Sequence, residues 1–456
     1  MTRTAFAAAL LAATALAAPA SAQADTASEI AAMRAEIAAL QAKVEALEAA
    51  AASASRPSTP APVPVPVPVP APAAQASMPA WRGAPTFTSE GGWSFKPRGR
   101  IQYDAGWVGR PDGVADRGLG FSNELRRLRL GAEGHIPGGF NYKFEVDFAE
   151  SAVEIVDATV GYNAGGGFGL TLGQHNPFQS LEELTSSRFS SFIERAAFTD
   201  AFNFERRVGL SAAYAKGPLI ANVGIFTDNV ADLDEDDNNA IGVDGRIVFA
   251  PKMGDTQLHF GGSAHWRDNR DLAANGLTTR YRQRPLIHST DVRFIGTPAI
   301  VVDRETSYGL EAAAIHGPFH AVAETHWLEA DPLAPGGAKA NFSGGYAEVG
   351  WYLTGETRGY RNGLFDRTRV LRPVGDGGFG AVQINLRYDH LDLNNGGLIG
   401  GKQTGYLASL IWIPQDYVRF MINYGRLAYD DATLPAAGGD RDYKVDVIGA
   451  RAQIDF

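Results

Sequence analysis

From Trp93 to its last residue, the chain repeats short runs in which apolar and polar side chains alternate one by one. In residues 142–148 the apolar positions are Tyr142, Phe144, Val146 and Phe148, and the charged positions between them are Lys143, Glu145 and Asp147. A period of two is that of a β-strand, whose successive side chains point to opposite faces. A water-soluble sandwich turns its apolar face inward, whereas a membrane barrel turns that face to lipid and its charged face to a water-filled lumen.

We count sixteen such runs, near 94–108, 124–136, 139–149, 153–162, 167–174, 207–216, 218–227, 240–250, 255–267, 305–316, 318–330, 341–354, 377–391, 402–413, 416–429 and 442–456. Closing them into a barrel removes the unpaired edges that an open sheet would expose. The sequence therefore predicts an all-β fold, a 16-stranded antiparallel transmembrane β-barrel. The alternative is a large water-soluble all-β protein.

The connections between these runs are of two kinds. Tight turns rich in Gly and Pro are expected at 137–139, 165–167, 216–218, 317–318 and 414–416. Long loops are expected at 175–206, 268–304 and 355–376, at the opposite end of the barrel.

The segment before the barrel has three parts. Residues 1–22 read as a signal peptide, with Arg3 before an apolar stretch and Ala20-Ser21-Ala22 as the cleavage site. Residues 25–54 predict a short periplasmic coiled-coil helix, whose seam is Ile30, Met33, Ile37, Leu40, Val44 and Leu47. Residues 55–80 form a Pro-rich linker, extended by alternate prolines. The helix either forms an oligomeric stalk or packs on the mouth of its own barrel.

Composition excludes several classes of function. The chain has no Cys, which excludes a disulfide scaffold and thiolate metal sites, and its net charge of −10 argues against nucleic acid as a partner. No H-E-x-x-H or G-x-S-x-G motif occurs, so we expect no enzyme, no cofactor and no metal. The acidic run 232–237 lacks the glycine of a calcium loop, and we interpret it as a solvated loop facing lipopolysaccharide.

Several motifs resemble those of the phosphate-selective porin O and P family. They are Leu125-Arg126-Arg127-Leu128-Arg129-Leu130-Gly131, the run 142–149, Gly173-Gln174, Pro177-Phe178, the run 181–187, Glu194-Arg195, the run 351–356, Leu386-Arg387-Tyr388 and the ending 451–456. The resemblance covers residues 93–456. It implies a sixteen-stranded outer-membrane porin of a Gram-negative bacterium, usually trimeric, with an inward-folded third external loop and an anion-preferring channel.

The alternation itself places a basic track on the inward face. Its residues are Lys96, Arg98, Arg100, Arg127, Arg129, Arg419 and Arg451, and closure of the barrel brings them onto one wall at staggered heights. Their guanidinium and ammonium groups offer successive weak sites for phosphate or carboxylate oxygens. Lys143, Arg246 and Arg387 are further inward cations, and the inward charges of the lumen nearly balance, because the inward acidic candidates are Asp104, Glu133, Glu145, Asp147, Asp157, Glu324 and Asp389. A nearly neutral wall of structural ion pairs is therefore the alternative.

The loop that follows residue 174 is rich in aromatic residues, which would not stay splayed in water. We expect it to fold into the barrel and narrow it. Its constriction candidates are Arg188, Arg195, Arg206 and Arg207.

The expected function is passive diffusion of small hydrophilic solutes through the outer membrane, with preference for inorganic phosphate or other small anions. The expected partners are these anions, outer-membrane lipid and lipopolysaccharide, two further copies of the chain in a homotrimer, and peptidoglycan through the N-terminal stalk. The alternative is a general or organic-acid porin that also tethers the envelope through its coiled coil.

Overall fold

A computed structural model describes residues 38, 41–43, 80–149, 152–233, 239–333 and 338–456. The predicted signal peptide and Pro-rich linker lie outside these residues. Of the predicted coiled-coil helix, only Ala38 and Gln41–Lys43 are described, and they are helical. Most of the acidic run 232–237 also lies outside the described residues.

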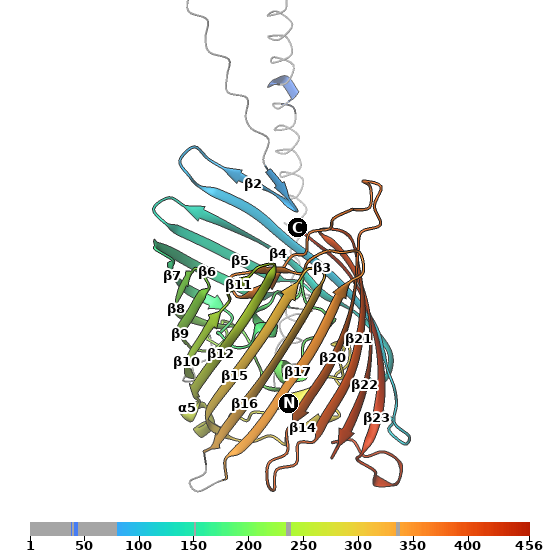
Figure 1. The fold of residues 1–456 in the computed structure, drawn as a ribbon. Helices are drawn as coiled ribbons and strands as arrows, with labels where there is room; N and C mark the ends of the chain where they lie inside the picture. Colours follow the sequence, from blue (N-terminus) through green and yellow to red (C-terminus); the bar gives the residue numbers. More distant parts are fainter. Residues whose placement is uncertain (1–37, 39–40, 44–79, 150–151, 234–238, 334–337) are drawn as a thin grey trace, which may run out of the picture. The chain divides into compact units, whose positions relative to one another are not determined.

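The chain from Ser94 onward forms a closed ring of sixteen antiparallel strands, in which neighbours along the sequence are paired neighbours in space (Figure 1). The strands are β3 (Ser94–Val108), β4 (Gly120–Ile136), β5 (Phe140–Asp147), β6 (Glu154–Gly165), β7 (Phe168–His175), β8 (Arg207–Lys216), β9 (Leu219–Phe226), β10 (Ile241–Phe249), β12 (Thr256–Asp268), β15 (Val302–His316), β16 (Phe319–Pro332), β17 (Ala340–Tyr352), β20 (Ala381–Asp392), β21 (Lys402–Gln415), β22 (Val418–Asp430) and β23 (Tyr443–Asp455). The ring closes where β23 pairs with β3, with Arg451 opposite Asp104. The predicted barrel is confirmed.

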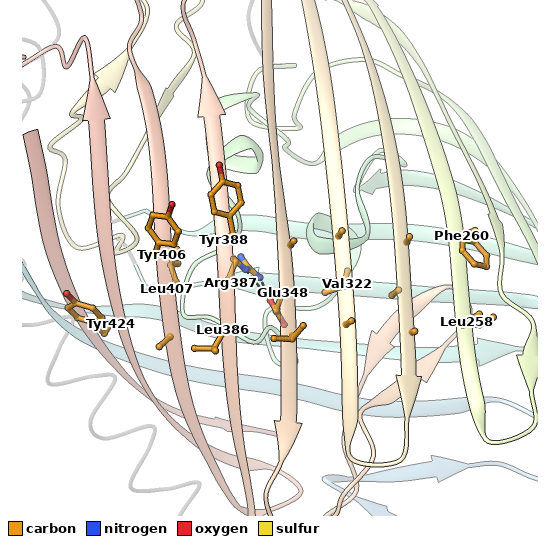
Figure 2. Close-up of a pocket in the computed structure, with 18 residues that line it drawn as sticks. Leu258, Phe260, Val322, Glu348, Leu386, Arg387, Tyr388, Tyr406, Leu407 and Tyr424 are labelled. Carbon is orange, nitrogen blue, oxygen red and sulfur yellow. Dashed lines mark hydrogen bonds and ion pairs between the residues drawn. The ribbon is translucent and has the colours of Figure 1, made fainter. Parts of the chain in front are cut away.

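The two faces of the wall differ as the alternation predicted. On β3, Ile101, Tyr103 and Trp107 are exposed on the outer face, whereas Gln102 and Asp104 are buried on the inner face. Lipid can solvate the outer side chains, and every strand finds backbone partners on both sides. Part of this outer face is hollowed: alanines of β15, β16 and β17 lie between the larger Phe260 and Tyr388. Figure 2 shows the aromatic side chains of this face, while Glu348 and Arg387 belong to the buried inner face.

Several smaller elements are not strands of the sixteen-stranded ring. β1 (Ala80–Arg82) and β2 (Ala84–Thr88) form a hairpin that extends β3, β11 (Lys252–Met253) lies in the turn before β12, and a 3-10 helix spans Ala437–Gly439. The connection 176–206 contains α3 (Leu181–Leu184) and α4 (Ala197–Ala201). The connection 269–301 contains α5 (Arg270–Ala274) and the ribbon of β13 (Arg282–Gln283) and β14 (Ile295–Gly296). None of the helices that the structure describes is long and apolar enough to cross a membrane.

The predicted long loop 355–376 lies at the opposite end of the barrel from the one expected, within the connection 353–380. This connection joins β17 to β20 at the end where β21 turns into β22, which is the end of the short turns (Figure 1). It is long because it returns as a hairpin, β18 (Gly359–Arg361) and β19 (Leu364–Asp366), toward the inner wall. There Arg246 donates to the carbonyl oxygen of Gly363 at 3.0 Å.

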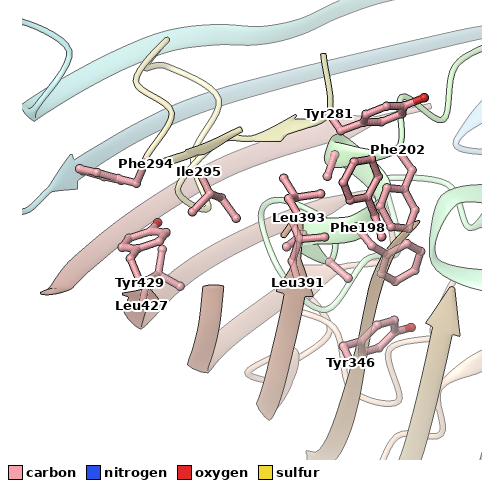
Figure 3. Packing of buried hydrophobic residues seen from close by; sticks show 14 of the residues in the cluster. Phe198, Phe202, Tyr281, Phe294, Ile295, Tyr346, Leu391, Leu393, Leu427 and Tyr429 are labelled. Carbon is pink, nitrogen blue, oxygen red and sulfur yellow. The ribbon is translucent and has the colours of Figure 1, made fainter. Parts of the chain in front are cut away.

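The inside of the barrel is partly filled by apolar side chains (Figure 3). Phe198 of α4 stacks on His326 at 4.7 Å between ring centroids, and Phe294 of the 269–301 connection contacts Tyr429 at 5.0 Å. These contacts remove aromatic surface from water and hold both connections against the inward faces of the strands. The expectation that the segment after β7 folds into the barrel is confirmed.

Candidate functional site

The constriction segment, residues 176–206, is attached to the wall opposite the basic strands. The carboxylate of Glu324 on β16 accepts hydrogen bonds from the backbone N–H groups of Leu181 and Glu182, at 2.8 and 2.7 Å. The carboxylate of Asp389 on β20 accepts from the N–H of Ala197 at 3.1 Å. Carboxylates suit the unpaired N–H groups at the first turn of a helix. Two of the predicted inward acids therefore hold the segment in place.

Two arginines of the same wall complete this attachment. Arg387 binds Glu182 of the segment at 2.8 Å and Glu348 of β17 at 2.6 Å. Arg419 donates to the carbonyl oxygens of Arg188 and Ser190, at 2.9 and 2.6 Å. The segment also contacts the basic strands, where Arg100 donates to the hydroxyl of Ser187 at 2.5 Å, and a polar space remains between the segment and β3–β6.

That space is a cavity of about 270 Å³ with a strongly basic lining, which we call the basic cavity. Eight cationic side chains face three carboxylates there. The cations are Arg98, Arg100, Arg127, Arg129, Lys143, Arg188, Arg195 and Arg206, and the carboxylates are Glu145, Asp157 and Glu183. The lining therefore has a local excess of positive charge, although Arg98 also pairs with Glu133 and Arg129 also pairs with Asp147 beside it.

Each strand carboxylate of the basic cavity is shared by several cations. Glu145 lies 3.1 Å from Arg129 and 3.5 Å from Arg100, and Asp157 lies 2.6 Å from Lys143 and 3.2 Å from Arg206. A shared carboxylate neutralises only part of the charge around it, so positive charge remains available to a solute.

Arg127 is the cation with the weakest neutralisation. Its guanidinium donates to the side-chain oxygen of Gln102 at 2.8 Å, and within the described residues no carboxylate lies within 4.0 Å of it. Its Nε is buried and has no hydrogen-bond partner among the described residues. Such a group is costly to bury and gains most from an anion that enters the cavity.

Burial and neighbouring charges shift the pKa values of three side chains on the constriction segment. Burial raises the pKa of Glu183, and Arg195 at 3.3 Å opposes that shift. Burial lowers the pKa of Arg188, and the positive charge of Arg98 adds to the effect. Although burial alone would raise the pKa of Glu194, the guanidinium groups of Arg126 and Arg451 hold it well below its usual range.

Most of the predicted site residues meet around the basic cavity, but four do not. Arg98, Arg100, Arg127 and Arg129 of the predicted track line it together with Arg188, Arg195 and Arg206 of the constriction segment. Lys96 is half-buried near the short-turn end of β3 and does not line it. Arg419 does not line it either, because its guanidinium is bonded to the backbone of the constriction segment.

Arg451 and Arg207 also lie elsewhere. Arg451 binds both oxygens of Asp104, at 2.7 and 2.6 Å, because closure of the ring sets the two residues opposite each other. It also contacts Glu194 at 3.0 Å, so its charge is used within the protein. Arg207 lines a separate chamber of about 700 Å³ at the loop-bearing end, which we call the outer chamber.

The alternation pattern did not predict three further arginines near the site, Arg126, Arg358 and Arg367. Arg126 contacts Glu194 at 3.2 Å because a β-bulge between β3 and β4 breaks the alternation at that point. The adjacent pair Arg126-Arg127 between two leucines is the signal that could have revealed it. Arg358 and Arg367, from the connection 353–380, line a small pocket together with Arg188 on the short-turn side of the basic cavity. Because the loop 355–376 was expected at the opposite end of the barrel, the sequence did not place Arg358 and Arg367 in this pocket.

Comparisons with known proteins agree with this architecture. The family model described as phosphate-selective porin O and P matches residues 95–456. A Caulobacter vibrioides protein described as uncharacterized is 50% identical over 418 residues, which cover 89% of this chain and 83% of that protein. Porin O of Pseudomonas aeruginosa is 25% identical over 402 residues, covering 79% and 89%.

A solved structure of OmpT, an outer membrane protein of Vibrio cholerae, shares the fold with a TM-score of 0.50 at 11% identity, covering 84% of this chain and all of that one. The closed ring of lipid-facing strands and the family match over nearly all of it lead to one conclusion. The chain belongs to the phosphate-selective porin O and P family and is a porin of the outer membrane of a Gram-negative bacterium.

Proposed function

We propose that this porin is an anion-preferring diffusion channel whose solutes are inorganic phosphate and other small anions. The observation that carries the proposal is the lining of the basic cavity, where eight cations face three carboxylates. The net charge of the whole chain is negative, so an anion preference has to arise from such a local excess. The description of the family, which names phosphate, supports the same class of solute.

The geometry suits passage rather than tight capture. Arginine presents a planar fork that fits two oxygens of phosphate or carboxylate at once. In the basic cavity most of these forks are already partly engaged, as Arg100 is by Glu145 and by the hydroxyl of Ser187 at 2.5 Å. An anion therefore exchanges one weak partner for another, which allows it to enter and also to leave.

The proposal is tested by reversal potentials of single channels in planar bilayers under a KCl gradient. We expect the wild type to favour chloride over potassium, and Arg127→Gln to lower the chloride-to-potassium permeability ratio several-fold. Arg270→Gln is the matched control, because Arg270 lies on α5 with its side chain 56% exposed and outside the basic cavity. The proposal is contradicted if the wild type prefers potassium, or if Arg127→Gln has the same chloride-to-potassium permeability ratio as the wild type.

A further inference from the structure

The outer chamber differs from the basic cavity in size and in charge. Its volume of about 700 Å³ lies within the range of sites that enclose small organic molecules, on the order of 300–1,000 Å³. It lies between β8, β12, β15 and the connection 269–301, and it is also lined by Asp228, Asp232 and Asn239. A chamber of this size is far larger than a phosphate ion needs.

The lining of the outer chamber is balanced rather than basic. Four arginines and four carboxylates contribute to it, together with asparagine amides such as Asn203 and Asn269. Guanidinium groups bind carboxylates, and amides both donate to and accept from hydroxyl groups. This mixture matches a solute that carries one carboxylate and several hydroxyl groups better than it matches a bare ion.

One carboxylate of the chamber is held in a replaceable way. Glu205 lies 3.4 Å from Arg207 and 3.7 Å from Arg267, and its side chain is 49% exposed. The side chain of Arg207, by contrast, is only 6% exposed. The Nε atoms of Arg207 and Arg267 are buried and have no hydrogen-bond partner among the described residues. Arg267 is also bound by Asp228, whereas Glu205 is the one carboxylate in contact with Arg207 among the described residues. A buried, incompletely bonded guanidinium such as that of Arg207, beside an exposed carboxylate, has the arrangement of a carboxylate site occupied by the protein's own side chain.

We propose that the outer chamber binds hydroxylated organic carboxylates, such as sugar acids, whose carboxylate replaces that of Glu205 on Arg207 and Arg267. The inference rests on the proposed anion pathway and adds to it a solute class and a capture site. Arg207 lines the outer chamber and Arg206, the residue before it, lines the basic cavity, so the two cavities meet at this point of the chain.

The test uses the full-length porin in planar bilayers, with sodium gluconate added to the loop-bearing side while the chloride current is recorded. We expect gluconate to block the current at a half-blocking concentration that Glu205→Gln lowers several-fold, because the internal competitor is weakened. Arg207→Gln should raise that concentration about tenfold, since a hydrogen bond to a charged group is lost. Sorbitol, which has the same carbon skeleton without the carboxylate, should not block at the same concentrations.

Glu329→Gln is the matched control, because Glu329 pairs with Lys339 outside the outer chamber. An unchanged half-blocking concentration in Glu205→Gln overturns the inference even if Arg207→Gln does not fold, and so does block by sorbitol. Reversal potentials of the same channels separate the two proposals. Chloride preference without gluconate block overturns only the capture site, whereas potassium preference overturns the anion pathway and the capture site with it.

Discussion

At the scale of single residues, the partners of a charged group decide whether its charge is available to a solute. Arg451 and Arg127 were both predicted to line the channel, and both are buried. Arg451 is bound by Asp104 and Glu194, whereas among the described residues Arg127 has only the amide oxygen of Gln102 as an acceptor. The same residue type on the same wall therefore serves structure in one place and faces the basic cavity in the other.

A pH dependence follows from Glu183. Because burial raises the pKa of Glu183, this carboxyl takes up a proton at a higher pH than an exposed glutamate does. Protonation removes a negative charge from the basic cavity, so we expect the chloride-to-potassium permeability ratio to rise as the pH falls from about 7 to about 5. Reversal potentials measured across this range check the prediction.

Glu183→Gln should show the higher ratio already at neutral pH and a flatter pH profile. Glu329→Gln, which changes an exposed carboxylate outside the basic cavity, should keep the profile of the wild type. A wild-type ratio that stays constant or falls on acidification contradicts the role assigned to Glu183.

At the scale of elements, the constriction segment owes its position to the wall it crosses to. α3 has four residues and α4 has five, which is too short for either helix to be stable by itself. Their first N–H groups are bonded by Glu324 and Asp389, and their apolar side chains pack in the cluster of Figure 3. The segment therefore depends on contacts with strands more than a hundred residues further along the chain.

Removing one of these contacts should loosen the segment. In Glu324→Ala the buried N–H groups of Leu181 and Glu182 lose their acceptor, which costs about 1–3 kcal/mol each. We expect faster trypsin cleavage after Arg188 or Arg195 in proteoliposomes, measured by mass spectrometry of the fragments. Glu329→Ala is the matched control, because Glu329 lies on the same strand and pairs with Lys339 at the surface. Equal cleavage of the two variants would show that the segment does not need Glu324.

At the scale of the whole molecule, the barrel exists only when its last strand reaches its first. At this seam the N–H of Gly99 donates to the carbonyl oxygen of Phe456 at 3.1 Å, and the N–H of Phe456 donates back at 3.0 Å. The ring of Phe456 covers Gly99, where a Cβ atom would lie 2.0 Å from the aromatic Cζ. The terminal aromatic residue thus packs on a position that has no side chain.

A side chain at residue 99 should weaken the closure of the barrel between β23 and β3. We expect Gly99→Val to lower the stability of the barrel by about 1–3 kcal/mol, because the ring of Phe456 has to move. The folded fraction on unheated detergent gels, followed against temperature, measures this loss as a lower midpoint. Gly397→Val is the control, since a Cβ atom at Gly397 would meet no atom within 4 Å. Equal midpoints for the two variants would exclude the proposed role of the seam.

The segment that precedes the barrel remains a separate prediction. Since the closed ring contains only strands from β3 onward, deleting residues 23–75 should leave single-channel conductance unchanged. If the predicted coiled coil tethers the envelope, the same deletion should increase the sensitivity of cells to detergent. A loss of conductance in the purified variant contradicts the first expectation, and unchanged sensitivity contradicts the second.

The sequence by itself determined the strands, because alternation with a period of two is a local property that each run carries within itself. The same pattern also predicted which face of the wall each side chain lies on: Trp107 lies on the outer face and Asp104 on the inner face. The resemblance also identified the segment that folds inward. Length alone misled at 355–376, since a connection can be long at either end if it returns into the lumen.

Only the tertiary structure decided which inward charges face a solute. Arg127 and Arg451 look alike in the sequence, and so do Glu145 and Glu324, but Glu324 is bound to the constriction segment and Arg451 to Asp104. The partners that neutralise these groups come from strands and connections distant in the chain, and no local pattern records such encounters. Electrostatic availability depends on distances of a few ångströms, which exist only after the barrel has closed and its connections have packed inside it.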